Sequence, residues 1–254
     1  MSKCLNFLNK FEVSPLATLF IFLTLLTNSY KLFYIYFLIT FIHEMGHVTV
    51  AAFFKLKVSK IKLLAIGFNA EIDDLNYTSS LKEFFITVAG PLTYFVSELV
   101  LSYFYKMNFI SYNALIQAKT INKFELIFNL LPIIPLDGGR ILKIITDNFL
   151  PTKKSLFLVS ILSCCFTIVF IYNTRYSPQW MMYVFLVLCN VYFFITINKR
   201  WKLFLIYRLS FDNKYKIKIH NHNDIYRNNN NFYIKGKELI SEKNFVKKLI
   251  MNNI

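Results

Sequence analysis

The residues best suited to chemistry are His43, Glu44 and His47, which form an H-E-x-x-H motif within an apolar stretch at residues 32–54. A spacing of four places both imidazoles on one face of a helix, where they can bind a single Zn²⁺ ion. Glu44 can act as a general base that takes a proton from the attacking water and passes it to the leaving amine. The motif therefore predicts a zinc metalloendopeptidase.

The apolar surroundings of the motif support a functional interpretation. A carboxylate near the centre of a bilayer costs about 2.5 kcal/mol or more, so an ionisable residue at that depth is a candidate for function. The alternative is a structural role, in which neighbouring helices satisfy the two histidines and the glutamate. The remaining histidines, His220 and His222, lie in a polar segment and are expected to be exposed to solvent.

A catalytic zinc ion needs a third protein ligand, and Asp137 is the best candidate. It lies in the sequence NLLPIIPLDGGR, residues 129–140, where prolines and glycines interrupt the helix. Broken helices at membrane depth are common binding sites. At 1.5 Å per residue, His43 and Asp137 would lie about 16 and 20 Å into the bilayer. Taken alone, Asp137 could instead be a turn or helix-end aspartate.

The composition indicates an all-α polytopic membrane protein. The chain has 254 residues, of which 56% are hydrophobic, and its mean hydropathy is +0.44. One soluble core could not bury so much apolar surface. Stretches of about 20 apolar residues predict membrane helices. We expect six spans, at residues 15–28, 32–54, 82–105, 120–136, 155–173 and 179–198, with no cleavable signal peptide before the first.

The net charge of +15 reports membrane orientation rather than nucleic-acid binding. With the amino terminus in the cytoplasm, all but five of the 29 Lys and Arg residues fall in cytoplasmic segments, in agreement with the positive-inside rule. The five others are Lys31, Lys106, Lys119, Lys123 and Arg175. We therefore expect a multi-pass protein of the cell membrane with both termini in the cytoplasm and no direct nucleic-acid partner. The four cysteines have no CxxC spacing and are expected to be packing residues.

Two segments outside the predicted spans have a distinct character. Residues 58–73 contain a glycine and partly alternating apolar residues, which predict a short β-hairpin that is membrane-associated and lies against the active site. An ordinary cytoplasmic loop is the alternative. Residues 201–254 form a basic cytoplasmic α/β tail, attached to a core at residues 1–200. Its charge favours contact with the anionic inner leaflet of the lipid bilayer.

The two motifs together resemble those of the site-2 protease family of intramembrane zinc metalloproteases. That family has H-E-x-x-H in one span and an N-x-x-P-x-x-x-L-D-G-G type sequence in a later one. The second motif is supplied here by Asn129, Pro132, Leu136, Asp137, Gly138 and Gly139, and the AGPL sequence at residues 89–92 extends the resemblance. The six predicted spans and the small tail look most like the sporulation branch of the family.

The resemblance implies roles for particular residues and partners. The equivalents of His43, His47 and Asp137 bind zinc, that of Glu44 is the catalytic base, and that of Asn129 helps to position the substrate. The implied substrate is a membrane-associated sigma-factor precursor, cleaved in the membrane around the forespore under the control of regulatory membrane proteins. Residues 232–250 loosely resemble part of a CBS motif. Because the tail is short, we expect a reduced remnant that binds ATP weakly or not at all and docks on the membrane core, a second chain or the substrate.

Two other functions are compatible with the motif. A membrane zincin of another family would take a glutamate from a later helix as its third ligand, and the candidates are Glu71, Glu83, Glu98, Glu125, Glu238 and Glu242. A non-catalytic metal-binding or transport protein is the second alternative. The intact Glu44 argues against the latter, because metal binding alone would not require a base at that position.

Overall fold

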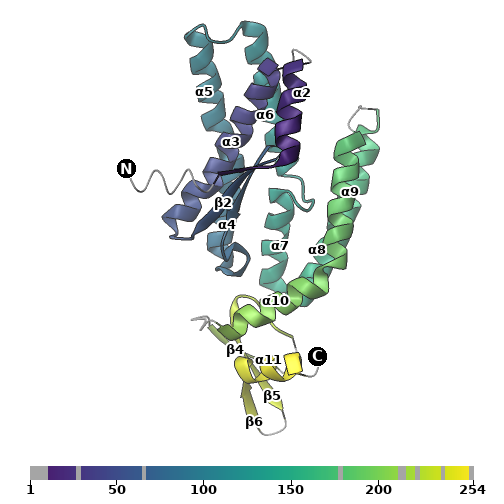
Figure 1. Ribbon diagram of the computed structural model, residues 1–254. Helices are drawn as coiled ribbons and strands as arrows, with labels where there is room; N and C mark the ends of the chain where they lie inside the picture. The colour runs from purple at the N-terminus through teal and green to yellow at the C-terminus, as the bar shows by residue number, and fades with distance from the viewer. Residues whose placement is uncertain are drawn as a thin grey trace. The chain divides into compact units, whose positions relative to one another are not determined.

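The computed structural model describes residues 11–26, 30–64, 67–176, 180–210, 216–220, 224–235 and 238–251, most of which are helical (Figure 1). The chain divides into two compact units, Met1–Leu130 and Leu131–Ile254. The first unit contains His43, Glu44 and His47, and the second contains Asp137 and the tail.

Helix α3 (Tyr30–Phe53) lies at the centre of the first unit, where it contacts α4 (Ser80–Leu92), α6 (Tyr112–Asn129) and the β-hairpin. Its 24 residues give a length of about 36 Å, which exceeds the thickness of a bilayer core. Gly46 permits the close approach of α4. A Cβ atom at this position would lie 2.5 Å from Thr93 Cγ2 and 2.6 Å from the Ala89 carbonyl oxygen.

The predicted hairpin at residues 58–73 is confirmed as strands β2 (Val58–Leu64) and β3 (Gly67–Ile72), which pair in antiparallel fashion. Strand β1 (Phe11–Val13) adds to β2 in parallel, so the sheet order is β1-β2-β3. Lys60 forms an ion pair with Glu12 at 2.5 Å and lowers the pKa of that carboxyl. Within the described residues, β1 covers one edge of β2, and β3 is the other edge strand of the sheet.

Helix α3 and the sheet bury a small apolar core between them. Its buried members are Val48 of α3 with Val58 and Ile61 of β2, and Met45 and Phe68 pack around them. Alternate residues of a strand point to opposite faces, which explains why Val58 and Ile61, separated by an irregularity in the register, can both face α3. This packing fixes the hairpin beside the turn of α3 that carries Glu44.

Three helical segments within the described residues are long and apolar enough to cross a membrane, and a fourth results if a bent helix pair is counted as one span. Three predicted spans, at residues 32–54, 82–105 and 155–173, coincide with such segments. They are Phe33–Phe53, Ser80–Lys106, which joins α4 to α5 (Tyr94–Lys106), and Thr152–Thr174, which is helix α8. The predicted span at residues 179–198 overlaps the bent pair.

The other two predicted spans fall on helices that are not among those long and apolar enough, as described, to cross a membrane. Helix α2 (Pro15–Leu26) has 12 residues, or about 18 Å, which is shorter than a bilayer core. Helix α6 begins at Tyr112 rather than near residue 120, and it ends at Asn129 because Pro132 disfavours helical backbone at the residue before it. The charged side chains of Lys119, Lys123 and Glu125 also lie on this helix.

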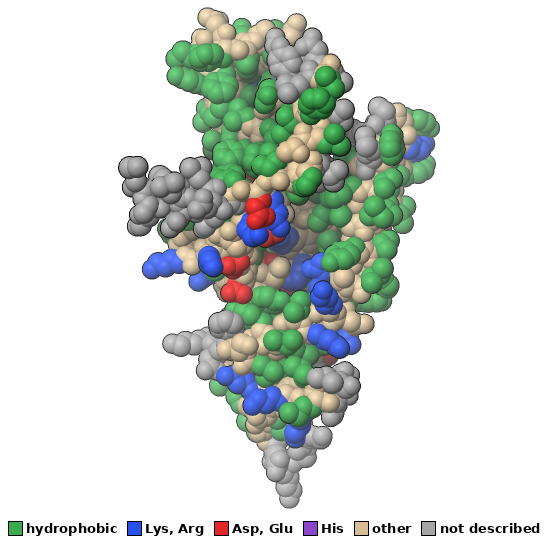
Figure 2. Space-filling model, viewed as in Figure 1, with side chains coloured by type: hydrophobic (Ala, Val, Ile, Leu, Met, Phe, Trp, Pro, Cys, Tyr) green, Lys and Arg blue, Asp and Glu red, His purple; other side chains and the backbone are tan. Residues whose placement is uncertain are grey.

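The second unit contains α7 (Asp137–Phe149), α8, α9 (Trp180–Ile195) and α10 (Ile197–Ser210). Helices α9 and α10 form the bent pair, with an angle of 56° between them. Figure 2 shows hydrophobic side chains over α9 and blue Lys and Arg side chains over α10 and the tail. Because basic and aromatic residues favour the membrane interface, α10 is suited to the end of a span.

The described part of the tail consists of β4 (Lys216–His220), β5 (Asn229–Lys235), β6 (Glu238–Ser241) and α11 (Glu242–Met251). Strand β5 lies between β4, which is parallel to it, and β6, which is antiparallel. Burial raises the pKa of Tyr233, whose hydroxyl donates a hydrogen bond to the Asp224 carbonyl at 3.1 Å. The phenol of Tyr233 therefore stays protonated well above the pH at which an exposed tyrosine ionises.

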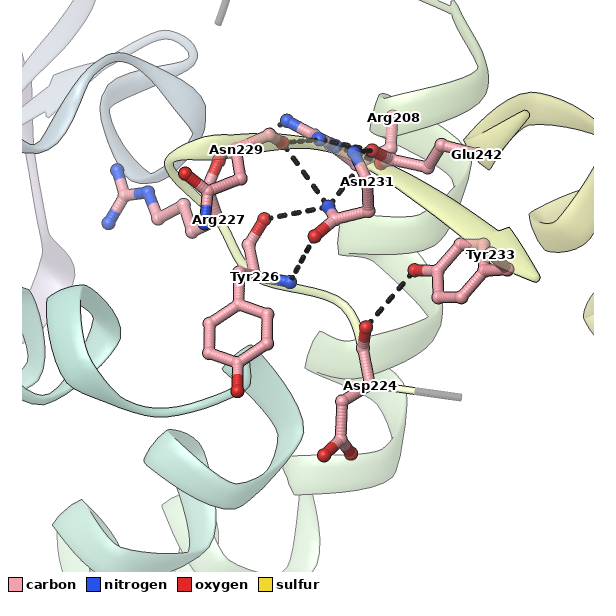
Figure 3. Close-up of polar contacts among 8 residues, drawn as sticks. All are labelled: Arg208, Asp224, Tyr226, Arg227, Asn229, Asn231, Tyr233 and Glu242. Carbon is pink, nitrogen blue, oxygen red and sulfur yellow. Dashed lines mark hydrogen bonds and ion pairs between the residues drawn. The ribbon is translucent and has the colours of Figure 1, made fainter. Parts of the chain in front are cut away.

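A buried ion pair links the tail to α10. The guanidinium of Arg208 donates to both carboxylate oxygens of Glu242, at 2.5 and 2.6 Å, and both residues are less than a tenth exposed. The same carboxylate accepts the backbone N–H of Asn231 at 2.8 Å. Figure 3 shows that the side-chain amide of Asn231 donates hydrogen bonds to the backbone carbonyls of Tyr226 and Asn229. The side chains of Arg208, Asn231 and Glu242 thus partner one another in the low-dielectric interior of the tail.

Candidate metal centre

The spacing of His43 and His47 brings their imidazoles together on one face of α3. Their Nε2 atoms are 3.2 Å apart, and both residues are buried, with 8% and 6% of their surface exposed. The rings are tilted by 77°, with centroids 4.9 Å apart. Two nitrogen atoms thus converge on one small volume, as the sequence predicted for a metal site.

Helix α4 supplies the wall opposite the two imidazoles. The Nδ1 atom of His47 lies 2.7 Å from the Ile86 carbonyl oxygen, which fixes the ring and leaves Nε2 for a metal. Gly90 lies one turn further along α4. A Cβ atom built at Gly90 would lie 2.2 Å from His47 Nε2 and 2.7 Å from His43 Nε2. Glycine at this position therefore keeps open the space in front of the ligand atoms.

Glu44 projects from the same turn of α3 towards the hairpin. Its Oε2 accepts a hydrogen bond from the backbone N–H of Ala70, in β3, at 3.1 Å. Ligand atoms of His43, Glu44 and His47 all lie within 4.8 Å of one another. In the described part of the chain, no other group of three His, Cys, Asp or Glu side chains is placed to hold a metal ion.

A cavity of about 10 Å³ adjoins His43, which is space for about one water molecule. Its polar lining comes from α5 and α6 and includes Ser97, Asn122 and Glu125, all of which are buried. The Asn122 amide donates to Glu98 Oε1 at 3.1 Å, and Glu98 forms an ion pair with Lys119 at 3.0 Å. Through Glu98 and Asn122, this ion pair is therefore connected to the cavity beside His43.

Asp137 is the first residue of α7 and follows the proline-containing segment at residues 131–136. This segment packs on the first turn of α7, where a Cβ at Gly139 would lie 2.5 Å from the Ile133 carbonyl oxygen. The backbone N–H of Ile134 donates to Ser163 Oγ, in α8, at 2.8 Å. These contacts fix the backbone just before Asp137.

A buried polar network in the second unit supports that segment. The Ser163 hydroxyl donates to Asn190 Oδ1 of α9, and the Asn190 amide donates to Thr167 Oγ1 at 3.0 Å and to the Leu186 carbonyl at 2.8 Å. Sequence reasoning missed this network, since a serine and an asparagine in apolar helices form no motif. Polar residues inside predicted spans were the signal that could have revealed it.

The remaining predicted residues lie as follows. Asn129 is the last residue of α6 and partly buried, in the first unit with the histidines, whereas Asp137 belongs to the second unit. Among the glutamates considered as alternative ligands, Glu71 pairs with Lys62 at 2.5 Å and Glu242 lies in the tail. The assignment of Asp137 as third ligand remains a prediction.

The residues present fit a zinc ion. Two imidazoles are ligands that zinc prefers, the Glu44 carboxylate lies beside them, and Gly90 leaves space before the nitrogens. His43 and His47 would hold the ion, which when bound polarises a water molecule and a carbonyl group. Glu44 is placed to accept a proton beside it.

The chain is similar to known peptidases over the region that contains the site. The family model described as Peptidase family M50 matches residues 31–121. Stage IV sporulation protein FB of Bacillus subtilis is 30% identical over 192 residues, which cover 73% of this chain and 66% of that protein. A zinc metalloprotease of Methanocaldococcus jannaschii is 38% identical over 120 residues, covering 46% of this chain and 34% of that protein.

The site-2 protease from Methanocaldococcus jannaschii is a solved structure similar to this chain. It has a TM-score of 0.47 and 26% sequence identity, and the match covers 74% of this chain and 89% of that one. The chain spans slightly less than two thirds of the length of the Bacillus relative and about a third of that of the curated archaeal one.

Proposed function

Because the chain belongs to peptidase family M50, the site-2 protease family, we propose that it is an intramembrane zinc metalloendopeptidase that cleaves a membrane-associated protein within or near the bilayer. One observation carries the proposal. The Nε2 atoms of His43 and His47 lie 3.2 Å apart on one face of α3, a helix that is long and apolar enough to span a membrane. Two such nitrogens beside a glutamate suit metal-assisted hydrolysis.

Each residue of the site has one role in this proposal. His43, His47 and Asp137 hold the zinc ion. Glu44 accepts the proton of the attacking water and then donates it to the leaving amine. The Ala70 N–H, which contacts Glu44 Oε2, keeps this carboxylate beside the sheet edge. Asn129, at the end of α6, binds the backbone of the substrate.

The substrate is presented as an extended strand, because a helix hides its amide bonds. Strand β3 is an edge strand of the described sheet, and it is the one whose Ala70 N–H contacts Glu44. Main-chain hydrogen bonds along β3 would place the scissile segment beside Glu44. Proline or glycine near the cut site should then speed cleavage. Equal rates for strongly helical substrates would contradict this mode of presentation.

The membrane arrangement that we propose has six spans and both termini in the cytoplasm. The distribution of basic residues supports this topology. The substrate is a sigma-factor precursor of a sporulating cell, cleaved under the control of regulatory membrane proteins. The name of the Bacillus relative, which refers to sporulation, supports this assignment. The ion would be required for cleavage in every case.

Co-expression with candidate sigma-factor precursors tests the activity. Cleavage is followed by immunoblotting, with the Glu44→Gln chain as a matched control of equal size. We expect a shortened precursor with the unmodified chain only, and about one zinc ion per chain in both purified proteins. Identical products from both chains would contradict proteolysis by this site. Metal transport that survives Glu44→Gln would favour the transport alternative.

A further inference from the structure

The segment at residues 224–229 connects the tail to the corner between α7 and α8. The backbone N–H of Thr152 donates to the Ile225 carbonyl at 2.9 Å, and Lys154 pairs with Asp224 at 3.0 Å. The side chains of Asn228 and Asn148 are also hydrogen bonded. The described part of the tail thus contacts α7 and α8 within the second unit.

The central contact of this corner is a buried ion pair between Arg227 and Asp147. Their Nη1 and Oδ2 atoms are 3.2 Å apart, and the two side chains are 3% and 0% exposed. Asp147 Oδ2 also accepts from Lys143 Nζ at 2.9 Å, one turn earlier on α7. Asp147 would keep Lys143 if Arg227 were removed, whereas the guanidinium of Arg227 would lose this buried carboxylate if the tail moved away, so the contact favours the docked tail.

Arg227 is itself held in place by the interior of the tail. Its carbonyl oxygen accepts a hydrogen bond from Arg208 Nη1 at 3.2 Å, and Arg208 is fixed by Glu242 (Figure 3). The position of Arg227 thus depends on α10 and α11 as well as on its own loop. A change in the packing of the tail would be transmitted directly to Asp147.

Asp147 and Asp137 lie on the same helix, about 15 Å apart along its axis. A helix of this length moves as a rigid rod, because its backbone hydrogen bonds are continuous. One end of α7 is located by Gly139 against Ile133, and the other by Asp147 against Arg227. Helix α7 also packs along α8, where the hydroxyls of Thr146 and Ser155 are hydrogen bonded at 2.8 Å, so the Arg227 contact adds to this packing in holding the C-terminal end of α7.

We propose that Arg227 is a positioning residue that, through its ion pair with Asp147, sets the orientation of α7 and thereby the placement of Asp137 for zinc. The tail then acts as a clamp, by which we mean that its Arg227 holds α7 in the orientation that brings Asp137 to the zinc ion. A partner that binds the tail and withdraws residues 224–229 would weaken zinc binding from a distance. This inference rests on the proposed function, because it requires Asp137 to be the third ligand.

The test uses the full chain in detergent and has two readouts that need no substrate. Hydrogen exchange measured by mass spectrometry reports on the first two turns of α7, and titration with a zinc chelator gives the zinc affinity. For Arg227→Met, we expect about tenfold faster exchange at residues 137–145 and about tenfold weaker zinc binding. Arg227→Lys should retain most of both.

The double variant Arg227→Met with Asp147→Leu separates a lost clamp from a damaged tail. It replaces the buried pair by apolar side chains and should restore both readouts towards the unmodified values. Lys154→Gln, which removes the exposed pair with Asp224 from the same segment, should change neither. Unchanged exchange at residues 137–145 in Arg227→Met would overturn the proposal.

Failure of the proposed function gives a different result. If Asp137→Ala keeps the zinc affinity of the unmodified chain, then Asp137 is no ligand and the premise is wrong. If Asp137→Ala loses zinc whereas Arg227→Met does not, the proposed metal site stands and the clamp is refuted.

Discussion

The backbone N–H of Ala70 donates a hydrogen bond to Glu44 Oε2 at 3.1 Å, so the edge of β3 contacts the proposed catalytic base directly. Backbone N–H groups alternate in direction along a strand. The amides of Phe68 and Ile72 therefore lie on the same edge of β3 as that of Ala70. These N–H groups of β3 and the Glu44 carboxylate therefore lie along the same edge of the sheet.

This contact predicts that Ala70→Pro lowers activity without unfolding the chain. Proline removes the N–H at the edge, and a hydrogen bond to a charged group contributes about 1.5–3 kcal/mol. We expect kcat/KM to fall about tenfold or more at unchanged zinc content. Asn69→Pro is the matched control, since its N–H faces β2, and it should instead lower thermal stability. Equal effects of both changes would contradict the edge assignment.

The proposed roles predict a separation of activity from metal content. Glu44→Gln should abolish cleavage and retain zinc, because glutamine cannot act as a base and Glu44 is not a ligand. His43→Ala, His47→Ala and Asp137→Ala should each lose both. Elemental analysis of the purified variants measures the zinc. Full zinc and activity in Asp137→Ala would disprove the third-ligand assignment.

Gly90→Ala is predicted to displace the metal from the site. The new Cβ atom would lie 2.2 Å from His47 Nε2, a distance that real Cβ contacts essentially never show. We expect little bound zinc and no cleavage, with helix content preserved in circular dichroism. Leu92→Ala, an exposed position on the same helix, serves as control and should bind zinc normally. Normal zinc content in Gly90→Ala would show that the wall of the site lies elsewhere.

Asn190→Ala should weaken the second unit and affect catalysis through it. The change leaves Ser163 and Thr167 without their buried partner, at a cost of about 1–3 kcal/mol. Because Ser163 also binds the Ile134 N–H, the segment before Asp137 should loosen. Thermal denaturation and cleavage rates check both effects. Val191→Ala, on the exposed side of α9, should lie within about 0.5 kcal/mol of the unmodified chain.

Glu242→Gln is predicted to destabilise the tail. Breaking a buried ion pair by removing one charge typically costs about 3–5 kcal/mol, and the buried charge of Arg208 would then face the backbone carbonyls of Arg227 and Asn229 without a carboxylate. Hydrogen exchange across β5 should accelerate, whereas Lys247→Gln, an exposed change on the same helix, should leave it unaltered. Unchanged protection in Glu242→Gln would mean that the ion pair contributes little to tail stability.

The sequence could predict what depends on local spacing. His43, Glu44 and His47 meet because helical geometry alone brings them together. Gly90, Ala70 and Ile86 contact them from other elements, and their positions depend on tertiary packing that no local pattern encodes. The start of α6 at Tyr112 was missed for a related reason. Hydropathy marks the apolar part of a helix, whereas Ser111, whose side chain caps α6, lies outside it.

The length of β3 limits how many residues of a substrate can pair with the sheet. Six residues of strand extend over about 20 Å, so a paired substrate would have roughly six residues in register with the sheet. Alternate side chains of such a segment point to opposite faces, and only every second one would face α3. Sequence preference around the cut should therefore be sparse and short, with about three selective subsites. Most of the remaining discrimination between substrates would then depend on whether a segment can unfold from its helix.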